Sequence, residues 1–466
     1  MMLANDRQAA RVRDNDTMIA KFRSRFLHLA SSKSLSARAM QSSVWVAMGF
    51  AGQRGLQFVS NLILTRLLFP EAFGLMALVT VFLVGLAMFS DIGLRPAVIR
   101  ERRSCEPDFL NTAWTIQVIR GFCLFGAGCA LAYPVSYIYD QEILFPLLIV
   151  VSSTAAISGF QTIGLATSER DLDFLRPTLI ALSGQIVGIV VLILLAWCWG
   201  TVWALAVGNV IGSIATVTIG HIVLRSHRHR ILLEPEAARS IVSFGRWIML
   251  STIVTFIGGE GLRALQAGLL TIAEFGVLSI AYTIALIASD LPAKLTGSVG
   301  LPALVEAHRS GPDRLAHVLW QVRRRVLIVA IPMTALVALM SGPMIKMLYD
   351  DRYQGAASYV LLLSGSNFIS VVYAGYTTAL LAMGRSKSYL CVMSFQAIAR
   401  ISGVYFGFLL SGVYGMILGL AVANLIILIL IWNFRDMKEI SSFWQDTLAI
   451  TIVTCVIFAI TSQYHV

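Results

Sequence analysis

The chain has 466 residues, of which 57% are hydrophobic and 13% are charged, with a mean hydropathy of +0.77 and a net charge of +11. A soluble domain of this length would carry far more polar residues, so the composition excludes an ordinary soluble protein. Apolar runs of about 18 residues or more recur along the chain, and they neither alternate nor stop at strand length, so we expect an all-α polytopic membrane protein.

Residues 1–41 are polar and basic, and they precede the first apolar run. Met18, Phe22, Phe26 and Leu29 repeat within them at helical spacing among lysines and arginines. This pattern favours a helix lying on the anionic membrane lipids, with a disordered basic tail as the alternative. The segment lacks the short apolar core and cleavage site of a signal peptide.

The first apolar run carries a polar stripe. Arg54, Gln57, Asn61 and Thr65 follow one another at steps of three, four and four, which places them on one face of a helix. A charged residue deep in the bilayer costs about 2.5–3.5 kcal/mol on insertion scales, so it usually faces a cavity or a partner. We therefore expect this helix to face lipid on one side and a polar cavity on the other.

Apolar runs predict thirteen spans, of which the last is short. The predicted spans are 42–68, 73–99, 113–136, 143–166, 176–198, 201–224, 243–268, 274–299, 326–348, 357–382, 388–411, 413–433 and 447–463. With a cytoplasmic N-terminus, 27 of the 36 lysines and arginines fall in cytoplasmic segments and only Arg352 falls in an outer loop. This asymmetry predicts that orientation, because cytoplasmic loops carry the excess of lysine and arginine.

Two sequence patterns occur twice in the same order. Residues 67–74 resemble residues 269–276, and residues 199–209 resemble residues 414–424. Six spans in each half would relate two six-helix bundles by an axis along the membrane normal, around a central cavity. The expected organisation is 1–41 as a basic segment, 42–224 as the first bundle, 225–242 as a basic linker, 243–433 as the second bundle, and 434–466 with one extra helix.

Three stretches carry a resemblance to a known family: "LILTRLLFPEAFGLMAL" at 62–78, "SERDLDF" at 168–174 and "LYDDRYQGAA" at 348–357. The chain resembles the polysaccharide transporters, or oligosaccharide flippases, of the multidrug/oligosaccharidyl-lipid/polysaccharide (MOP) exporter superfamily. The resemblance implies a twelve-helix core that moves an undecaprenyl-diphosphate-linked oligosaccharide across the bacterial inner membrane, with a polysaccharide polymerase and a chain-length regulator as partners.

Eight basic residues and three acids lie within the predicted spans, when Arg176 and Arg246 at the cytoplasmic ends of two spans are counted with the cytoplasmic segments. Arginine presents a planar fork that matches phosphate oxygens, so the deeper arginines are candidates for holding a diphosphate, and neutral amides for holding sugar hydroxyls. The substrate-binding candidates are Arg54, Gln57, Asn61, Arg120, Arg263, Gln396 and Arg400. Glu260 and Arg263 are three residues apart, so a simple ion pair within one helix is the alternative for them.

The chain has no GxxxxGK[ST] sequence for binding ATP, so transport would be coupled to a proton or sodium ion. A membrane-embedded acid is the usual site for such coupling. Glu260 is the strongest candidate. Asp91 and Asp290 are weaker, because each can pair with a basic residue four positions later, Arg95 and Lys294 respectively.

Competing functions remain at this stage. A MATE-like multidrug exporter for cationic drugs would call for an acidic cavity, and a membrane-embedded polysaccharide-synthesis enzyme would call for a catalytic loop that the sequence lacks. The six cysteines and seven histidines show no ligand spacing, so we expect no metal, no cofactor and no catalytic residues. Nothing indicates a nucleic-acid partner.

Overall fold

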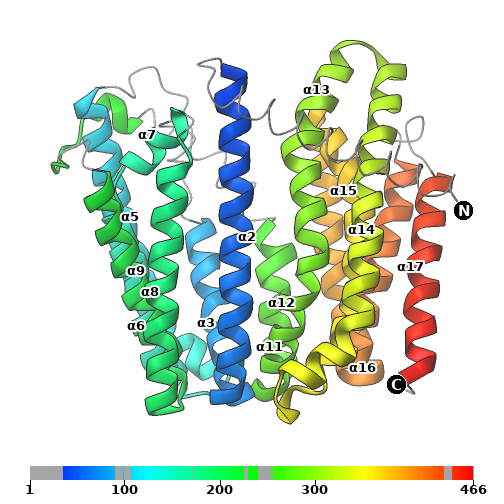
Figure 1. The fold of residues 1–466 in the computed structure, drawn as a ribbon, viewed down its shortest axis with the longest axis horizontal. Coiled ribbons are helices and arrows are strands. Elements are labelled where there is room, and N and C mark those ends of the chain that lie inside the picture. Colours follow the sequence, from blue (N-terminus) through cyan, green and yellow to red (C-terminus); the bar gives the residue numbers. More distant parts are fainter. Residues whose placement is uncertain are drawn as a thin grey trace, which may run out of the picture.

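The structure is a computed structural model, and it describes residues 35–89, 106–171, 173–224, 229–239, 255–434 and 443–464, together with residues 98 and 252. All regular elements in these ranges are helices, which confirms the expected all-α membrane fold (Figure 1). The predicted interfacial helix of the N-terminal segment and Asp91 lie outside the described residues.

The helices fall into two groups along the chain, here called the N-half and the C-half. The N-half comprises α2 (Leu35–Leu67), α3 (Pro70–Phe89), α5 (Pro107–Ile138), α6 (Leu144–Gly159), α7 (Gly164–Arg170), α8 (Leu175–Trp199) and α9 (Val202–Val223). The C-half comprises the π-helical turn η1 (Ile257–Gly261), α11 (Leu262–Leu269), α12 (Ile272–Leu295), the π-helical turn η2 (Thr296–Gly300), α13 (Leu301–Arg309), α14 (Pro312–Leu348), the 3₁₀ turn η3 (Asp351–Tyr353), α15 (Ala356–Ala382), α16 (Ser386–Asn433) and α17 (Phe443–Tyr464).

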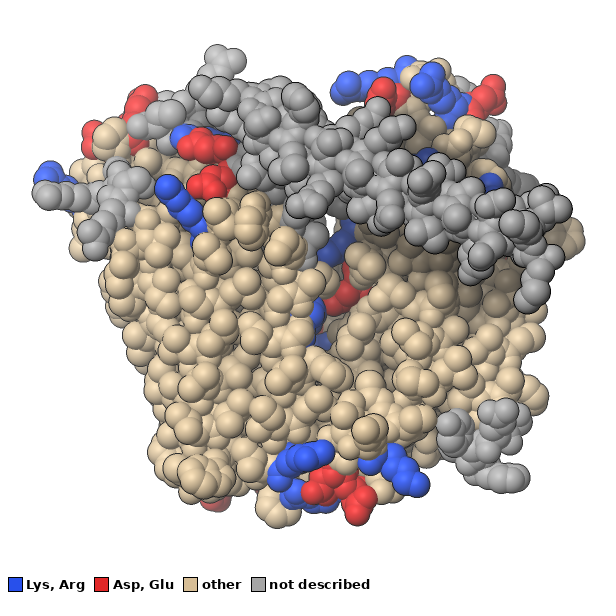
Figure 2. Space-filling view, in the orientation of Figure 1, with Lys and Arg blue, Asp and Glu red and all other residues tan. Residues whose placement is uncertain are grey.

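Figure 1 shows α5 to α9 on one side of the molecule and α13 to α17 on the other, with α2, α3, α11 and α12 between them. Among the described residues, nine helices are long and apolar enough to cross a membrane, or ten if α6 and α7 form one bent span. Charged side chains gather at the two ends of the helices in Figure 2, and the broad band between them shows charge only in the slot between the halves. Such a charge-free belt is what the hydrocarbon core of a bilayer requires. The thirteen-span topology and the cytoplasmic N-terminus stay predictions.

Two predicted spans differ from the helices observed. The predicted span 143–166 is broken, because α6 ends at Gly159 and α7 continues from Gly164 at an angle of 59°. The amide of Gln117 on α5 donates to the carbonyl oxygens of Gly159 (3.0 Å) and Gln161 (2.9 Å), so a side chain satisfies groups that a continuing helix would have used. The helix predicted at 326–348 begins earlier, at Pro312, so the predicted loop 300–325 is largely helical.

α16 contains the two spans predicted at 388–411 and 413–433. The chain turns back at Ser411 and Gly412. The backbone of Gly412 has φ 58° and ψ −136°, a conformation that only glycine adopts at little cost. The two arms then pack through glycines, since a Cβ on Gly407 would overlap the carbonyl of Gly415. Small residues of this kind let membrane helices approach closely.

The repeated segments meet each other where the two halves join. Gly74 at the start of α3 packs on the backbone of Ile272, and Gly276 at the start of α12 packs on the backbone of Pro70. A Cβ on either glycine would overlap the opposite carbonyl oxygen. Because Gly74 and Gly276, like Pro70 and Ile272, hold equivalent positions in the repeat, the contact is reciprocal, as a two-fold relation would produce.

The described part of the linker between the halves, residues 229–239, runs along α5 without regular structure as far as residue 234 and is helical from 235 to 239. Alternate backbone amides of the linker donate to polar side chains on one face of that helix. The three bonds, each 3.0 Å, join Arg230 to Asn111, Leu232 to Thr115 and Glu234 to Thr112. The linker is therefore fastened to the N-half along this stretch.

Candidate functional site

A cavity of about 850 Å³ lies between the two halves. Its wall is formed by α2, α3, α8, α9 and the end of α6 in the N-half and by α11 and α12 in the C-half. Figure 2 shows basic and acidic side chains inside the slot that separates the halves on this face. Among the described residues of the wall, the charged side chains are Arg54 and Arg263, and none is a carboxylate.

The polar stripe predicted on the first span lines this cavity along most of its length. Arg54, Gln57 and Asn61 all belong to the wall. Thr65, the last residue of the stripe, is buried below it and donates to the carbonyl of Leu62 at 3.2 Å. The apolar faces of α2 meanwhile carry exposed side chains such as Val59 and Ile63, as a lipid-facing surface would.

Arg54 is held by groups from both halves. Its Nη2 lies 2.6 Å from Oδ2 of Asp290 on α12, and its Nη1 donates to Oε1 of Gln57 at 3.1 Å. Its guanidinium also lies 5.5 Å from the centroid of the Phe50 ring, whose face is occupied by the Lys294 ammonium at 2.9 Å. Asp290 was a weaker candidate for ion coupling, because it could pair with Lys294 on its own helix; in the structure its carboxylate pairs with Arg54 of the other half.

Arg263 and Glu260 form the ion pair within one helix that was the alternative interpretation of their spacing, although the pair is a loose one. Nη1 of Arg263 lies 3.7 Å from Oε2 of Glu260, and that oxygen is buried without a hydrogen-bond partner. The pair spans the junction between η1 and α11, where the π-helical turn widens the helix. Arg263 also lies 5.4 Å from the ring of Tyr282, whose hydroxyl accepts from Gln266 at 3.0 Å.

Arg400 and Gln396 do not belong to the cavity wall. Arg400 is enclosed in the C-half, where it donates to Asn424 (3.0 Å), Ser370 (3.0 Å) and Tyr373 (2.6 Å). When the oxygen and nitrogen of its side-chain amide are exchanged, Gln396 accepts hydrogen bonds from both terminal nitrogens of Arg400, at 3.0 and 3.1 Å. These two polar side chains are therefore accounted for by bonds between α15 and the two arms of α16.

Arg120 lines a second cavity, of about 670 Å³, between α3, α5 and the break between α6 and α7. Its Nη2 donates to the carbonyl of Ala87 at 2.8 Å. Ser158 and Gln161 line both cavities, so the second lies beside the first. Of the seven predicted substrate contacts, the structure thus brings four to the main cavity, namely Arg54, Gln57, Asn61 and Arg263.

The sequence was compared with those of known protein families. The profile described as "Polysaccharide biosynthesis protein" matches residues 63–358, which is more than half of the chain. The chain belongs to the polysaccharide biosynthesis protein family. The match confirms the resemblance of the chain to proteins of polysaccharide biosynthesis.

Curated relatives of this family member carry names of the same kind. "Lipopolysaccharide biosynthesis protein WzxC" of Escherichia coli (strain K12) is 19% identical over 394 residues, which cover 84% of this chain and 80% of that protein. "Succinoglycan biosynthesis transport protein ExoT" of Rhizobium meliloti (strain 1021) is 21% identical over 386 residues, which cover 83% and 77%. These names indicate a transporter of polysaccharide biosynthesis.

Solved structures show that the fold is that of MOP transporters. "Lipid II flippase MurJ, inward closed conformation" aligns with a TM-score of 0.67 at 14% identity, over 91% of this chain and 99% of that one. A multidrug resistance MATE transporter in an inward-facing conformation aligns with a TM-score of 0.64 at 15% identity, over 86% and 95%. At these identities the likeness establishes the fold alone.

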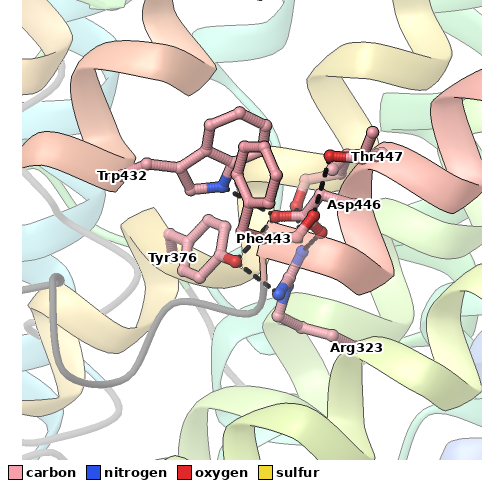
Figure 3. A network of polar contacts seen from close by, with 7 residues as sticks. Arg323, Tyr376, Trp432, Phe443, Asp446 and Thr447 are labelled. Atoms are coloured by element: carbon pink, nitrogen blue, oxygen red, sulfur yellow. Dashed lines mark hydrogen bonds and ion pairs between the residues drawn. The ribbon is translucent and has the colours of Figure 1, made fainter.

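One charged cluster in this polysaccharide biosynthesis protein was not anticipated. Arg323 of α14 and Asp446 of α17 form an ion pair whose side chains are 3% and 0% exposed. The same carboxylate accepts from Tyr376 (2.7 Å) and Trp432 (2.9 Å), and Figure 3 shows these side chains converging on it. The sequence placed Arg323 in a cytoplasmic loop and Asp446 just before the last span, where each resembles a solvated residue.

Proposed function

We propose that this protein is a flippase that moves an undecaprenyl-diphosphate-linked oligosaccharide across the bacterial inner membrane. The observation that carries the proposal is the wall of the main cavity, whose charged side chains among the described residues are two arginines; the carboxylates paired with them, Asp290 and Glu260, lie outside the wall. Because the wall draws on helices of both halves, a bound headgroup would contact each of them. Such a site suits a ligand that has to pass between the halves.

The chemistry of the wall fits each part of that headgroup. Arg54 and Arg263 offer guanidinium forks to the phosphate oxygens, and arginine stays charged when it is partly buried. Gln57 and Asn61 continue the same helix face and offer amides to sugar hydroxyls. A volume of about 850 Å³ lies within the range of cavities that hold ligands of moderate size.

The driving force in this proposal is a proton or sodium gradient, since the sequence has no Walker motif for ATP. Glu260 is the coupling acid that we favour. Its Oε2 is buried, and the nearest cation lies at 3.7 Å, beyond ordinary hydrogen-bond distance. Movement of Arg263 toward a substrate phosphate would leave this carboxylate to a proton or a sodium ion.

A multidrug exporter of the MATE type shares this fold, and it is the alternative function. Its cationic substrates would meet Arg54 and Arg263 in the wall, and the carboxylates beside these arginines, Asp290 and Glu260, lie outside the wall and are already paired with them. Like charges within a few ångströms repel each other, so the composition of this wall favours an anionic substrate.

The test uses a strain from which the gene is deleted. We expect lipid-linked oligosaccharide to accumulate on the cytoplasmic leaflet, and we expect the wild-type gene to clear it. Arg54→Ala should fail to clear it at normal protein level, and Arg54→Lys should restore export only in part, because a point charge cannot make the forked contact.

Arg176→Ala is the matched control, since Arg176 is an exposed arginine 3.6 Å from Asp173, outside the cavity wall. It should export normally. Normal export by both Arg54→Ala and Arg263→Ala, or a deletion strain without accumulated lipid-linked oligosaccharide, would contradict the proposal.

A further inference from the structure

We infer that Asp290 occupies the position at Arg54 that a substrate phosphate would take, and so keeps small inorganic anions out of the empty cavity. The inference rests on the proposed function, because it assigns a selectivity role within the same anion site. It starts from a pairing that joins the two halves: Arg54 belongs to α2 and Asp290 to α12, and their side chains lie 2.6 Å apart.

Each terminal nitrogen of the Arg54 guanidinium already has an acceptor. Nη2 is bound by the Asp290 carboxylate and Nη1 by the Gln57 amide oxygen. A phosphate that bridged these two nitrogens in a forked contact would take the place that the carboxylate now holds at Nη2. Binding of the substrate at Arg54 is therefore an exchange of one oxyanion for another.

The pair is open enough for this exchange. The side chain of Arg54 is 43% exposed and that of Asp290 is 24% exposed, so the pair is not sealed from solvent, and Arg54 itself lines the cavity. A pair with this exposure contributes at most about 1 kcal/mol, which a multiply charged headgroup can overcome and a small dilute anion cannot. The contrast with the buried pair of Arg323 and Asp446, 3% and 0% exposed, shows what a permanent ion pair looks like in the same chain.

A displaced Asp290 has a second cation within one helical turn. Lys294 lies four residues later on α12, and its ammonium now rests on the ring of Phe50. Residues four apart on a helix are neighbours, so the released carboxylate can turn toward Lys294. Exchange at Arg54 would thus remove an ion pair between the halves and replace it with one inside the C-half.

The test measures binding of farnesyl diphosphate to the purified full-length protein at fixed ionic strength, with inorganic phosphate as the competitor. Asp290→Asn keeps the size of the side chain and removes its charge. We expect this variant to bind farnesyl diphosphate about fivefold more tightly than wild type, which corresponds to about 1 kcal/mol. Phosphate should compete at a correspondingly lower concentration.

Asp350→Asn is the matched control, because Asp350 also pairs with an arginine, Arg352, but in the turn after α14 and outside the cavity wall. Its binding should equal that of wild type. Combining Asp290→Asn with Arg54→Gln should cancel the gain, because the effect acts through Arg54.

The outcomes distinguish a failure of the inference about Asp290 from a failure of the proposed flippase function. If wild type binds farnesyl diphosphate in a manner that Arg54→Gln abolishes, and Asp290→Asn binds no more tightly, the inference about Asp290 is overturned and the anion site stands. If binding by wild type does not depend on Arg54, the inference about Asp290 is overturned, whereas the flippase proposal fails only if Arg54→Ala and Arg263→Ala both export normally. Loss of binding in Asp290→Asn with an unchanged elution profile would also overturn the inference.

Discussion

Asp446→Ala should destabilise the C-half more than any other single loss of an ion pair described above. Arg323 is 3% exposed and would keep its charge without the carboxylate that now balances it. Removing one partner of such a buried pair costs about 3–5 kcal/mol. The hydroxyl of Tyr376 and the indole of Trp432 would also lose their acceptor on α17.

The assay is equilibrium unfolding in detergent, with thermal unfolding as a second measurement. The double variant Arg323→Met with Asp446→Leu removes both charges, and we expect it to be closer to wild type than Asp446→Ala, because no uncompensated charge remains. Asp350→Ala is the control for loss of an exposed ion pair and should change stability little. Hydrogen bonds from Arg352 lower the pKa of the Asp350 carboxyl, so the pair does form. Because the pair is exposed, solvent screens it and its loss should change the free energy of unfolding little.

Two results would refute the reasoning about this cluster. One is an Asp446→Ala variant within about 0.5 kcal/mol of wild type, the range of ordinary surface substitutions. The other is a double variant that is destabilised at least as much as Asp446→Ala, because the cost would then come from lost packing and not from the unpaired charge.

Two further predictions concern the junction of the halves and the topology. Gly276→Ala places a methyl against the carbonyl of Pro70 and should loosen the junction, so that a cysteine at the cavity residue Met76 reacts faster with an impermeant thiol reagent applied from the outer side. Gly126→Ala is the control, because a Cβ there meets nothing within 4 Å, and it should leave the reaction rate unchanged. Equal rates in the two variants would contradict the prediction. In a background without reactive native cysteines, a cysteine at Gln354 should label in intact cells and one at Ser310 should not, and the reverse pattern would overturn the predicted orientation.

Periodicity and charge were sufficient to predict the parts of the site that lie on one helix. The stripe of Arg54, Gln57 and Asn61 could be found because helical spacing alone puts these residues on one face. The same reasoning found the pair of Glu260 and Arg263, three residues apart. Both depend on the geometry of a single helix and not on how helices pack.

Spacing within a single helix could not predict the contacts between different helices. The partner of Asp290 is separated from it by more than two hundred residues, and Lys294, one turn away, was the nearer candidate. Arg400 looked like a cavity residue by depth, yet its bonds with Ser370 and Asn424 enclose it in the C-half. Which face of a span meets a partner is decided by tertiary packing, which spacing within one helix does not contain.

The reciprocal contact between Gly74 and Gly276 has the form of an interface between two identical subunits, where one substitution always falls on both sides of the axis. In a single fused chain the two sides are inherited separately and can change one at a time. They have already done so at the helix starts: α3 begins with Pro70, whereas α12 begins with a capping box in which Thr271 and Glu274 bond each other's backbone amides. The fused chain can thus make one side of the junction stiffer than the other, which a symmetric dimer cannot do.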